Sequence, residues 1–234
     1  MTHALTHGYR HIDAAYCYGN EDEVGRGIAA AITSGAVTRS EIFITTKLWC
    51  TYHTRVAAAL EKSLASLGLD YVDAYLVHWP VAMNPAGSHE KFPRRPDGSR
   101  DLVPERNHVD TWLDMQALLG TGKVRAIGVC NYSAKYLRAL LDDPRVTVVP
   151  AINQIENHPQ LPQDETLELC RQRGILITAY SPLGSTGSPL ITLEEVRAVA
   201  EKHGVEPSTV LLSYHGKNFI YISPFSSIIK SFLR

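Results

Sequence analysis

Residues 42–80 read IFITTKLWCTYHTRVAAALEKSLASLGLDYVDAYLVHWP, and this stretch carries the pattern of the whole fold. Residues 42–46 and 71–78 are short runs rich in isoleucine, valine and tyrosine, a composition typical of strands. Between them, Val56, Leu60, Leu64 and Leu67 recur at the spacing of one helix face. We therefore predict a strand–helix–strand unit, in which a crossover helix joins two parallel strands.

The same alternation extends over most of the chain. Further strand patterns cover residues 9–13, 124–129, 148–154 and 175–180, with helical patterns between them. Asn20 and Ser133 stand where helix caps are expected, and Thr192 with Glu195 is typical of a capping box. No linker interrupts the alternation, so we expect one layered α/β domain, either an open parallel sheet or a closed (β/α)8 barrel. Barrels typically take ~250 residues, and this chain has 234.

The composition argues against several classes of protein. Lysine and arginine total 23 against 24 aspartates and glutamates, a balance that argues against nucleic acid as a partner. No apolar run is long enough to cross a bilayer, and residues 1–10 lack the apolar centre of a signal peptide. The cysteines form no CxxC pair, which indicates free thiols in a reducing compartment, so we expect a cytoplasmic protein without a membrane partner.

One connection between the predicted elements is unusually long. Residues 80–108 contain Pro80, Pro85, Pro93, Pro96 and Pro104, and they show no regular apolar pattern. Irregular connections of this length are often functional. This one follows the C-terminal end of the predicted strand at 71–78, which is the active-site end in parallel architectures, so we expect a lid.

Polar residues recur where the predicted strands end. They are Asp13, Lys47, His78, Asn131, Gln154, Tyr180 and Ser181, with Tyr18 five residues after the first. Each alone is interpreted more simply as a solvated or capping group. Because parallel strands end at one edge of a sheet, the repetition predicts a functional site there. No metal site is expected, since His3 and His7 share a helical spacing but have no third ligand near them.

Asp13, Tyr18, Lys47 and His78 suit a proton transfer. A free tyrosine titrates near ~10, which is too high for acid–base catalysis at neutral pH. A lysine ammonium beside the phenol would lower that pKa, and an aspartate would hold the lysine in place. A histidine could orient a carbonyl oxygen by a hydrogen bond. Together they predict a site that gives a proton to a carbonyl group while the carbonyl receives a hydride.

Six motifs follow one another along the chain. They are GYRHIDAAYCYGNEDEVG (residues 8–25), IFITTKLWCTYH (42–53), YVDAYLVHWP (71–80), GKVRAIGVCNYS (122–133), INQIENHP (152–159) and ITAYSPLGS (177–185). In this order they resemble the motifs of the aldo-keto reductase family, over residues 2–214. KLWCTYH, HWP and the PDGSR loop look most similar to fungal glycerol dehydrogenases and glyceraldehyde reductases and to aldose reductases.

The resemblance implies a (β/α)8 barrel and the cofactor NADPH/NADP+, bound without a Rossmann motif. The residues that match the catalytic tetrad are Asp13, Tyr18, Lys47 and His78, with Tyr18 as general acid. The residues that match cofactor contacts are Asp13, Cys130, Asn131, Gln154, Tyr180, Ser181, Leu183 and Ser185. Tyr180 would stack on the nicotinamide ring, and residues 181–185 would hold the pyrophosphate. Trp49, His78 and Trp79 match walls of the substrate pocket.

Both ends of the chain differ from the family pattern. Residues 2–7 match the end of the family's first helix, so its first strand has no counterpart. From residue 216 onward, GKNFIYISPFSSIIKSFLR resembles no family segment, and the family's clamp for the adenosine 2′-phosphate is not recognised. We therefore expect an aldo-keto reductase domain over residues 1–215 and a non-family tail over residues 216–234. The barrel would be incomplete, with the first strand missing and the eighth absent or replaced.

The resemblance predicts an enzyme that reduces aldehydes or ketones to alcohols with NADPH. Small hydroxyaldehydes such as glyceraldehyde are the leading substrates, and glycerol oxidation is the reverse reaction. The expected enzyme is a monomer whose partner is a small carbonyl compound. Two alternatives stay open. One is a catalytically impaired, truncated family member that acts as a non-catalytic or binding protein, and the other is a barrel hydrolase that uses His78 with Asp13.

Overall fold

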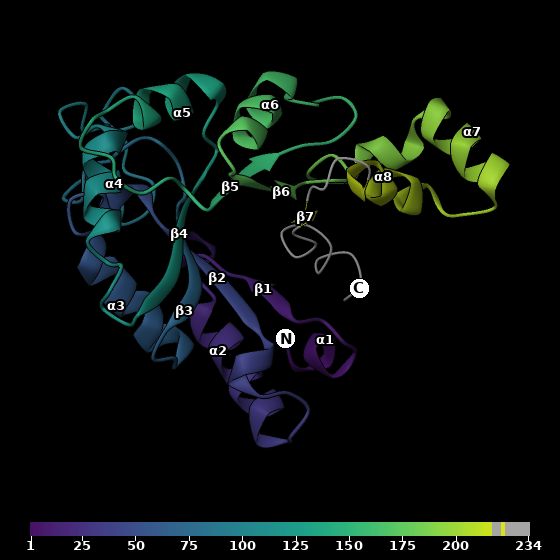
Figure 1. Cartoon of the computed structure of the whole chain (residues 1–234), viewed down its shortest axis with the longest axis horizontal. Helices are drawn as coiled ribbons and strands as arrows, with labels where there is room; N and C mark the ends of the chain where they lie inside the picture. Colours follow the sequence, from purple (N-terminus) through teal and green to yellow (C-terminus); the bar gives the residue numbers. More distant parts are fainter. Residues whose placement is uncertain (217–220, 223–234) are drawn as a thin grey trace. The chain divides into compact units, whose positions relative to one another are not determined.

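The computed structural model describes residues 1–216 and the backbone of residues 221–222 (Figure 1). The chain forms two compact units. The first unit contains residues 1–130 and 135–150, and the second contains residues 131–134 and those from 151 onward. Among the described residues, no helix is long and apolar enough to cross a membrane.

Four parallel strands form the sheet of the first unit. They are β1 (His11–Asp13), β2 (Phe43–Leu48), β3 (Val72–Val77) and β4 (Val124–Cys130). Each strand pairs in parallel with the next one in the chain, with β1 on β2, β2 on β3 and β3 on β4. A doubly wound sheet reverses its strand order, whereas a (β/α)8 barrel adds strands in chain order. The pairing therefore selects the barrel pattern from the two architectures that the sequence left open.

Helices and short turns connect these strands. The helices are α1 (Thr2–Thr6), α2 (Glu21–Thr33), α3 (Val56–Leu67) and α4 (His108–Gln116), and α5 (Ala134–Leu141) follows β4. The 3-10 turns are η1 (Tyr16–Tyr18), η2 (Arg39–Glu41) and η3 (Cys50–Tyr52). Gly25 lets α2 approach the end of α3, because a Cβ at this position would lie 2.3 Å from the carbonyl oxygen of Leu67.

The buried residues of β3 explain its position inside the sheet. All six are buried, as expected for a parallel strand that is covered on both faces. Asp73 is the charged one among them. Its carboxylate accepts hydrogen bonds from Arg39 at 2.8 Å, from Arg125 at 3.1 Å and from the N–H of Ile44 at 2.9 Å. Two guanidinium groups therefore compensate a charge that would otherwise be costly to bury.

The second unit repeats the parallel pattern. Its strands are β5 (Ile152–Glu156), β6 (Leu176–Tyr180) and β7 (Tyr221–Ile222), and β6 pairs in parallel with both neighbours. Its helices are α6 (Asp164–Gln172), α7 (Glu194–His203) and α8 (Pro207–Gly216), with the 3-10 turn η4 (Pro189–Thr192) before α7. Leu183, Leu190, Val196 and Leu211 form its buried apolar cluster.

The strand predicted over residues 148–154 is wrong at both ends, since β5 covers Ile152–Glu156. The backbone of the preceding residues is bound elsewhere. The side-chain oxygen of Gln116 accepts hydrogen bonds from the N–H groups of Thr147 and Val148. The indole of Trp112 donates to the carbonyl of Val148. Gln154 consequently lies in the middle of β5 and not at its end.

One predicted cap was wrong, and another occupies the cap position without a side-chain hydrogen bond. Thr192 belongs to η4, where its hydroxyl donates to the carbonyl of Pro189, so it does not cap α7. Asn20 occupies the N-cap position of α2, but its side chain makes no capping hydrogen bond. A capping box occurs instead at Thr38 and Glu41 of the η2 turn, where the N–H of Thr38 donates to the carboxylate of Glu41 at 2.7 Å. Propensity marks candidate caps, whereas the local backbone path decides which side chain reaches a free N–H.

The described residues contain seven strands, against eight in a complete (β/α)8 barrel. The last, β7, lies within the segment predicted to be a non-family tail, and its backbone pairs with β6. The rest of that segment, residues 217–220 and 223–234, lies outside the described residues. The boundary after His215 therefore stays a prediction, while the consecutive parallel pairing confirms an incomplete barrel pattern.

Candidate active site

The first unit brings the four predicted tetrad residues together at the C-terminal ends of its strands. Asp13 is the last residue of β1, and Lys47 lies next to the end of β2. His78 follows β3 directly, and its N–H donates to the carbonyl of Leu48 at 3.0 Å. Tyr18 ends the η1 turn, which the chain enters three residues after β1. The parallel register places these ends at one edge, as the sequence predicted.

Lys47 is the centre of this group. Its side chain is fully buried, and its Nζ lies 2.7 Å from Oδ1 of Asp13, itself only 4% exposed. The same ammonium donates to the hydroxyl of Tyr18 at 3.2 Å and to the carbonyl of Ala14 at 3.0 Å. Three oxygen atoms thus surround one buried cation, which compensates much of its desolvation.

The surroundings of Lys47 and Tyr18 shift the pKa values of both side chains. Burial by itself lowers the pKa of Lys47, but the interaction with the Asp13 carboxylate, together with smaller effects, outweighs it and leaves the pKa above its usual 10.5. Desolvation of the phenol raises the pKa of Tyr18 above its usual 10.0, although 44% of the residue is exposed, and the ammonium of Lys47 offsets this only in part. Lys47 lowers the pKa of the phenol, as predicted, but desolvation outweighs this effect and the net shift is upward. The phenol stays protonated at neutral pH and is available as a proton donor.

His78 forms the other side of this site. Burial and the nearby charge of Lys47 lower the pKa of His78 well below 6.5, so its ring is neutral. The ring contacts Tyr18 edge-on, with 5.9 Å between centroids, and Trp49 edge-on at 5.1 Å. A neutral imidazole beside the phenol can orient a carbonyl oxygen without competing for the proton.

The two predicted pocket tryptophans differ in their surroundings. Trp49 is 5% exposed and lies between the rings of His78 and Phe92. Trp79 is 41% exposed. Phe92 comes from the proline-rich loop and was not predicted as part of the site, although the loop itself was predicted to be a lid. The sequence contains no signal that would distinguish Phe92 from the other residues of the loop.

Cys130 closes the group from the end of β4. Its side chain is buried, and burial raises the pKa of the thiol to about 12, with a smaller opposing effect from Lys47. The thiol is therefore protonated and unreactive at neutral pH. It is the last residue of β4, at the strand ends where the sequence predicted a contact to a cofactor.

The second unit holds most of the other predicted cofactor contacts. The hydroxyl of Tyr180, at the end of β6, donates to Oδ1 of Asn131 at 2.7 Å. The N–H of Asn131 donates to the carbonyl of Gln154 at 2.9 Å. Asn131 itself has a φ of 64°, in the left-handed region that few residues other than glycine and asparagine adopt. The two hydrogen bonds connect these three predicted residues into one group.

The loop after β6 has the chemistry of a phosphate-binding loop. Ser181, Ser185 and Ser188 all have φ between 49° and 58°, and Gly184 has a φ of 90°. Within the loop, the N–H of Gly184 donates to the carbonyl of Ser181, and the N–H of Ser188 donates to the carbonyl of Ser185. The serine hydroxyls are donors of the kind that bind phosphate oxygens, so the residue types fit the pyrophosphate predicted for this loop. Leu183 differs from them, because its side chain packs in the apolar cluster and only its backbone could contact a ligand.

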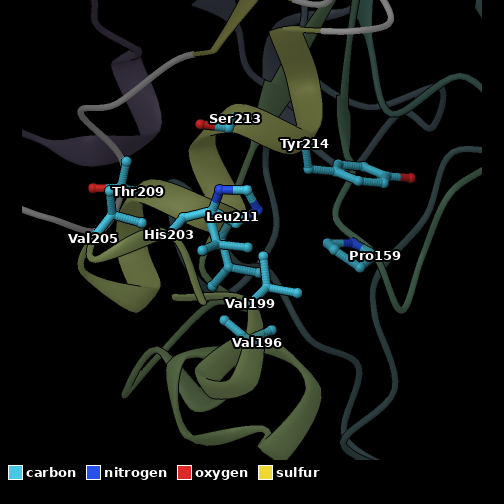
Figure 2. A pocket seen from close by; sticks show the side chains of 10 residues that line it. Pro159, Val196, Val199, His203, Val205, Thr209, Leu211, Ser213 and Tyr214 are labelled. Atoms are coloured by element: carbon cyan, nitrogen blue, oxygen red, sulfur yellow. The ribbon is translucent and has the colours of Figure 1, made fainter. Parts of the chain in front are cut away.

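A cavity of about 670 Å³ lies in the second unit, lined by apolar side chains of α7 and α8 (Figure 2). Val196, Val199 and Leu211 contribute to its wall together with Tyr214. None of the predicted site residues lines it, and apolar side chains make up most of its wall, with His203, Thr209 and Ser213 also present. Among the described residues, no group of three or more metal-ligating side chains occurs, and the four cysteines are free thiols.

Comparison with known proteins agrees with this geometry. The Aldo/keto reductase family matches residues 1–229. The chain is 60% identical to the D-galacturonate reductase of Hypocrea jecorina, over 92% of this chain and 69% of that protein. It is 46% identical to the glycerol 2-dehydrogenase (NADP(+)) of Saccharomyces cerevisiae, over 94% of this chain and 71% of that protein.

Solved structures show the same relationship. The aldose reductase from Giardia lamblia is similar with a TM-score of 0.88 and 35% identity, over 95% of this chain and 76% of that one. This similarity confirms that the chain has the fold of a (β/α)8 barrel in incomplete form. The prediction of an oxidoreductase is likewise confirmed. The chain belongs to the aldo/keto reductase family.

Proposed function

We propose that this chain reduces small hydroxyaldehydes to alcohols with NADPH, and that Tyr18 donates the proton. The observation that supports this most is the fully buried Lys47, which holds the Tyr18 hydroxyl at 3.2 Å and Asp13 at 2.7 Å. Membership of the aldo/keto reductase family supports carbonyl reduction with a nicotinamide cofactor. The name of the yeast relative, which includes NADP(+), supports NADPH as the form used.

The chain's own residues would divide the chemistry between them. When bound, NADPH supplies the hydride that reaches the carbonyl carbon. The neutral ring of His78 orients the carbonyl oxygen, and the protonated phenol of Tyr18 transfers its proton to that oxygen. The ammonium of Lys47 stabilises the resulting phenolate, and Asp13 keeps that ammonium charged and in place.

The second unit supplies several groups that would hold the cofactor. Asn131 and Gln154 offer amide groups for the nicotinamide carboxamide. Tyr180 offers its ring as a stacking surface, and Ser181, Leu183 and Ser185 offer the loop after β6 for the pyrophosphate. The hydrogen bond from Tyr180 to Asn131 supports this assignment, because it couples the stacking ring to a carboxamide contact.

The substrate would be a polyhydroxy aldehyde with the carbonyl near Trp49 and Trp79. Relatives named for D-galacturonate and for glycerol support an open-chain sugar aldehyde, charged or neutral. Glyceraldehyde and D-galacturonate therefore serve as the two test substrates. A barrel hydrolase that uses His78 with Asp13 is not retained, because Asp13 is bound by Lys47 and the family is that of reductases.

The test is NADPH oxidation by the purified chain with each aldehyde, beside its Tyr18→Phe variant. We expect turnover by the wild-type chain and a loss of at least about a hundredfold in kcat in the variant, the usual scale for a general acid. Turnover that the variant retains would contradict the role of Tyr18. No turnover by folded wild-type chain would favour the alternative of a catalytically impaired member that binds but does not react.

A monomeric protein in the cytoplasm remains part of the proposal. The four free thiols support a reducing compartment. A domain over residues 1–215 with a separate tail over 216–234 also remains a proposal. Sedimentation of the purified chain would test its state of association directly.

A further inference from the structure

Two adjacent residues of the proline-rich loop, Glu90 and Lys91, contact two parts of the active site at once. Their backbone carbonyls are bound from the segment that follows β2. The hydroxyl of Thr51 donates to the carbonyl of Glu90 at 3.0 Å, and Nε1 of Trp49 donates to the carbonyl of Lys91 at 2.6 Å. The loop is therefore anchored next to the strand that carries Lys47.

The side chains of the same two residues bind the η1 turn. The carboxylate of Glu90 accepts a hydrogen bond from the hydroxyl of Tyr16, and Nζ of Lys91 donates to the carbonyl of Cys17 at 3.3 Å. Lys62 from α3 joins this contact, 3.0 Å from Glu90 and 3.1 Å from the Tyr16 hydroxyl. Both residues of η1 that precede Tyr18 are thus held by the loop.

The η1 turn needs such support. It is a single 3-10 turn, and short 3-10 segments have little stability of their own. Its backbone bonds are those from the N–H of Tyr18 to Ala15 and from the N–H of Gly19 to Tyr16. Gly19 has a φ of 71°, and a Cβ there would lie 2.8 Å from Nζ of Lys91. Lys91 therefore covers the turn on both sides of Tyr18.

We propose that Glu90 and Lys91 form a clamp that positions the phenol of Tyr18 against the ammonium of Lys47. The carbonyls of the clamp bind the segment after Lys47, and its side chains bind the turn that carries Tyr18. Neither residue touches the tetrad's reacting atoms, so both are positioning residues. The inference rests on the proposed function and deepens it, because it assigns the long loop a role in proton transfer.

The clamp predicts a loss of rate without a loss of cofactor binding. A misplacement of the reacting group by about 1 Å can cost about a hundredfold in rate. Lys91→Met keeps the length of the side chain but removes the donor to Cys17, so we expect kcat to fall about tenfold or more while KM for NADPH changes less than about twofold. Lys91→Arg retains a donor and should recover kcat to within about threefold of wild type.

Two controls separate positioning from general loosening of the fold. Lys123→Met is a matched control, because Lys123 forms an exposed ion pair with Glu61. This variant should leave kcat within about twofold of wild type. Hydrogen exchange at the amides of Tyr18 and Gly19 measures the η1 turn directly and needs neither cofactor nor turnover. We expect faster exchange at these amides in Lys91→Met, and wild-type exchange in Lys91→Arg and Lys123→Met.

The outcomes are distinct. If Lys91→Met keeps kcat within about twofold of wild type, or if Lys91→Arg is equally slow, the clamp is refuted. If Lys91→Met does not fold, Glu90→Gln takes its place with the same criteria, because it weakens the contacts to Tyr16 and Lys62. If the wild-type chain shows no turnover that depends on Tyr18, the proposed function fails, and amide exchange alone decides on the clamp.

Discussion

The buried ion pair between Asp13 and Lys47 leads to a prediction that can be tested without any cofactor. Asp13→Asn leaves the ammonium of Lys47 buried without its counter-charge, and Lys47→Met does the same to the carboxylate. The double variant buries neither charge. Side-chain exposures of 0% for Lys47 and 4% for Asp13, with 2.7 Å between the charged atoms, make this pair a fully desolvated one.

The magnitude follows from that burial. Removing one partner of a buried pair costs about 3–5 kcal/mol, because the remaining charge stays desolvated. With a urea dependence of about 3 kcal/mol per molar, each single variant should lower the urea midpoint by about 1–2 M. The double variant should lose less than either single variant, since two neutral groups of similar size take the place of the pair.

Urea unfolding of the four proteins, followed by circular dichroism, measures this coupling as a double-mutant cycle. The exposed pair of Lys123 and Glu61, with side chains 44% and 54% exposed, serves as the control. Its cycle should give a coupling of at most about 1 kcal/mol. Losses from Asp13→Asn and Lys47→Met that simply add in the double variant would refute the reasoning.

Three further predictions concern other buried groups. Burial, aided by Arg106 and His108, lowers the pKa of His53 to about 3, so stability is full above about pH 6.5 and falls as pH decreases, by about 1.4 kcal/mol per unit. Urea midpoints at about pH 7 and pH 5 should show a smaller difference in His53→Asn than in wild type, and equal differences would contradict this. Gly25→Ala should lower Tm, because its Cβ would lie 2.3 Å from the Leu67 carbonyl and overpacking costs about 1–3 kcal/mol; an unchanged Tm in a thermal scan would count against it. Cys130, whose pKa burial raises to about 12, should react with iodoacetamide more slowly than the half-buried Cys17, and mass spectrometry of the native chain after limited alkylation would expose the opposite order.

Much of the fold could be predicted because its signals are local. The apolar run at β3 and the helical spacing of Val56 to Leu67 depend on residues close in the chain. Both elements occur where predicted, as Val72–Val77 and Val56–Leu67. The motifs that carry the family resemblance lie on these elements and on their neighbours, so the likeness and the pattern point to one architecture.

The errors occurred where a side chain or a backbone group has a partner other than the expected one. Residues 147 and 148 have strand-like side chains, yet Gln116 and Trp112 of α4 bind their backbone groups. The capping box expected at Thr192 fails for a similar reason, since the η4 turn uses its hydroxyl. Such competition depends on which atoms meet in space, and spacing along the chain does not encode it.

The sequence by itself determined which residue types stand at the ends of the strands. Because parallel connections bring those ends to one edge of the sheet, it also determined that these residues lie near one another. It therefore predicted Asp13, Tyr18, Lys47 and His78 as one group. Only the tertiary structure decided the balance of charge within that group. Burial depends on everything packed around a side chain, and it is the buried pair of Asp13 and Lys47 that sets the charge beside the Tyr18 phenol. The contacts of Glu90 and Lys91 with the η1 turn also required the folded chain, because they join segments more than seventy residues apart.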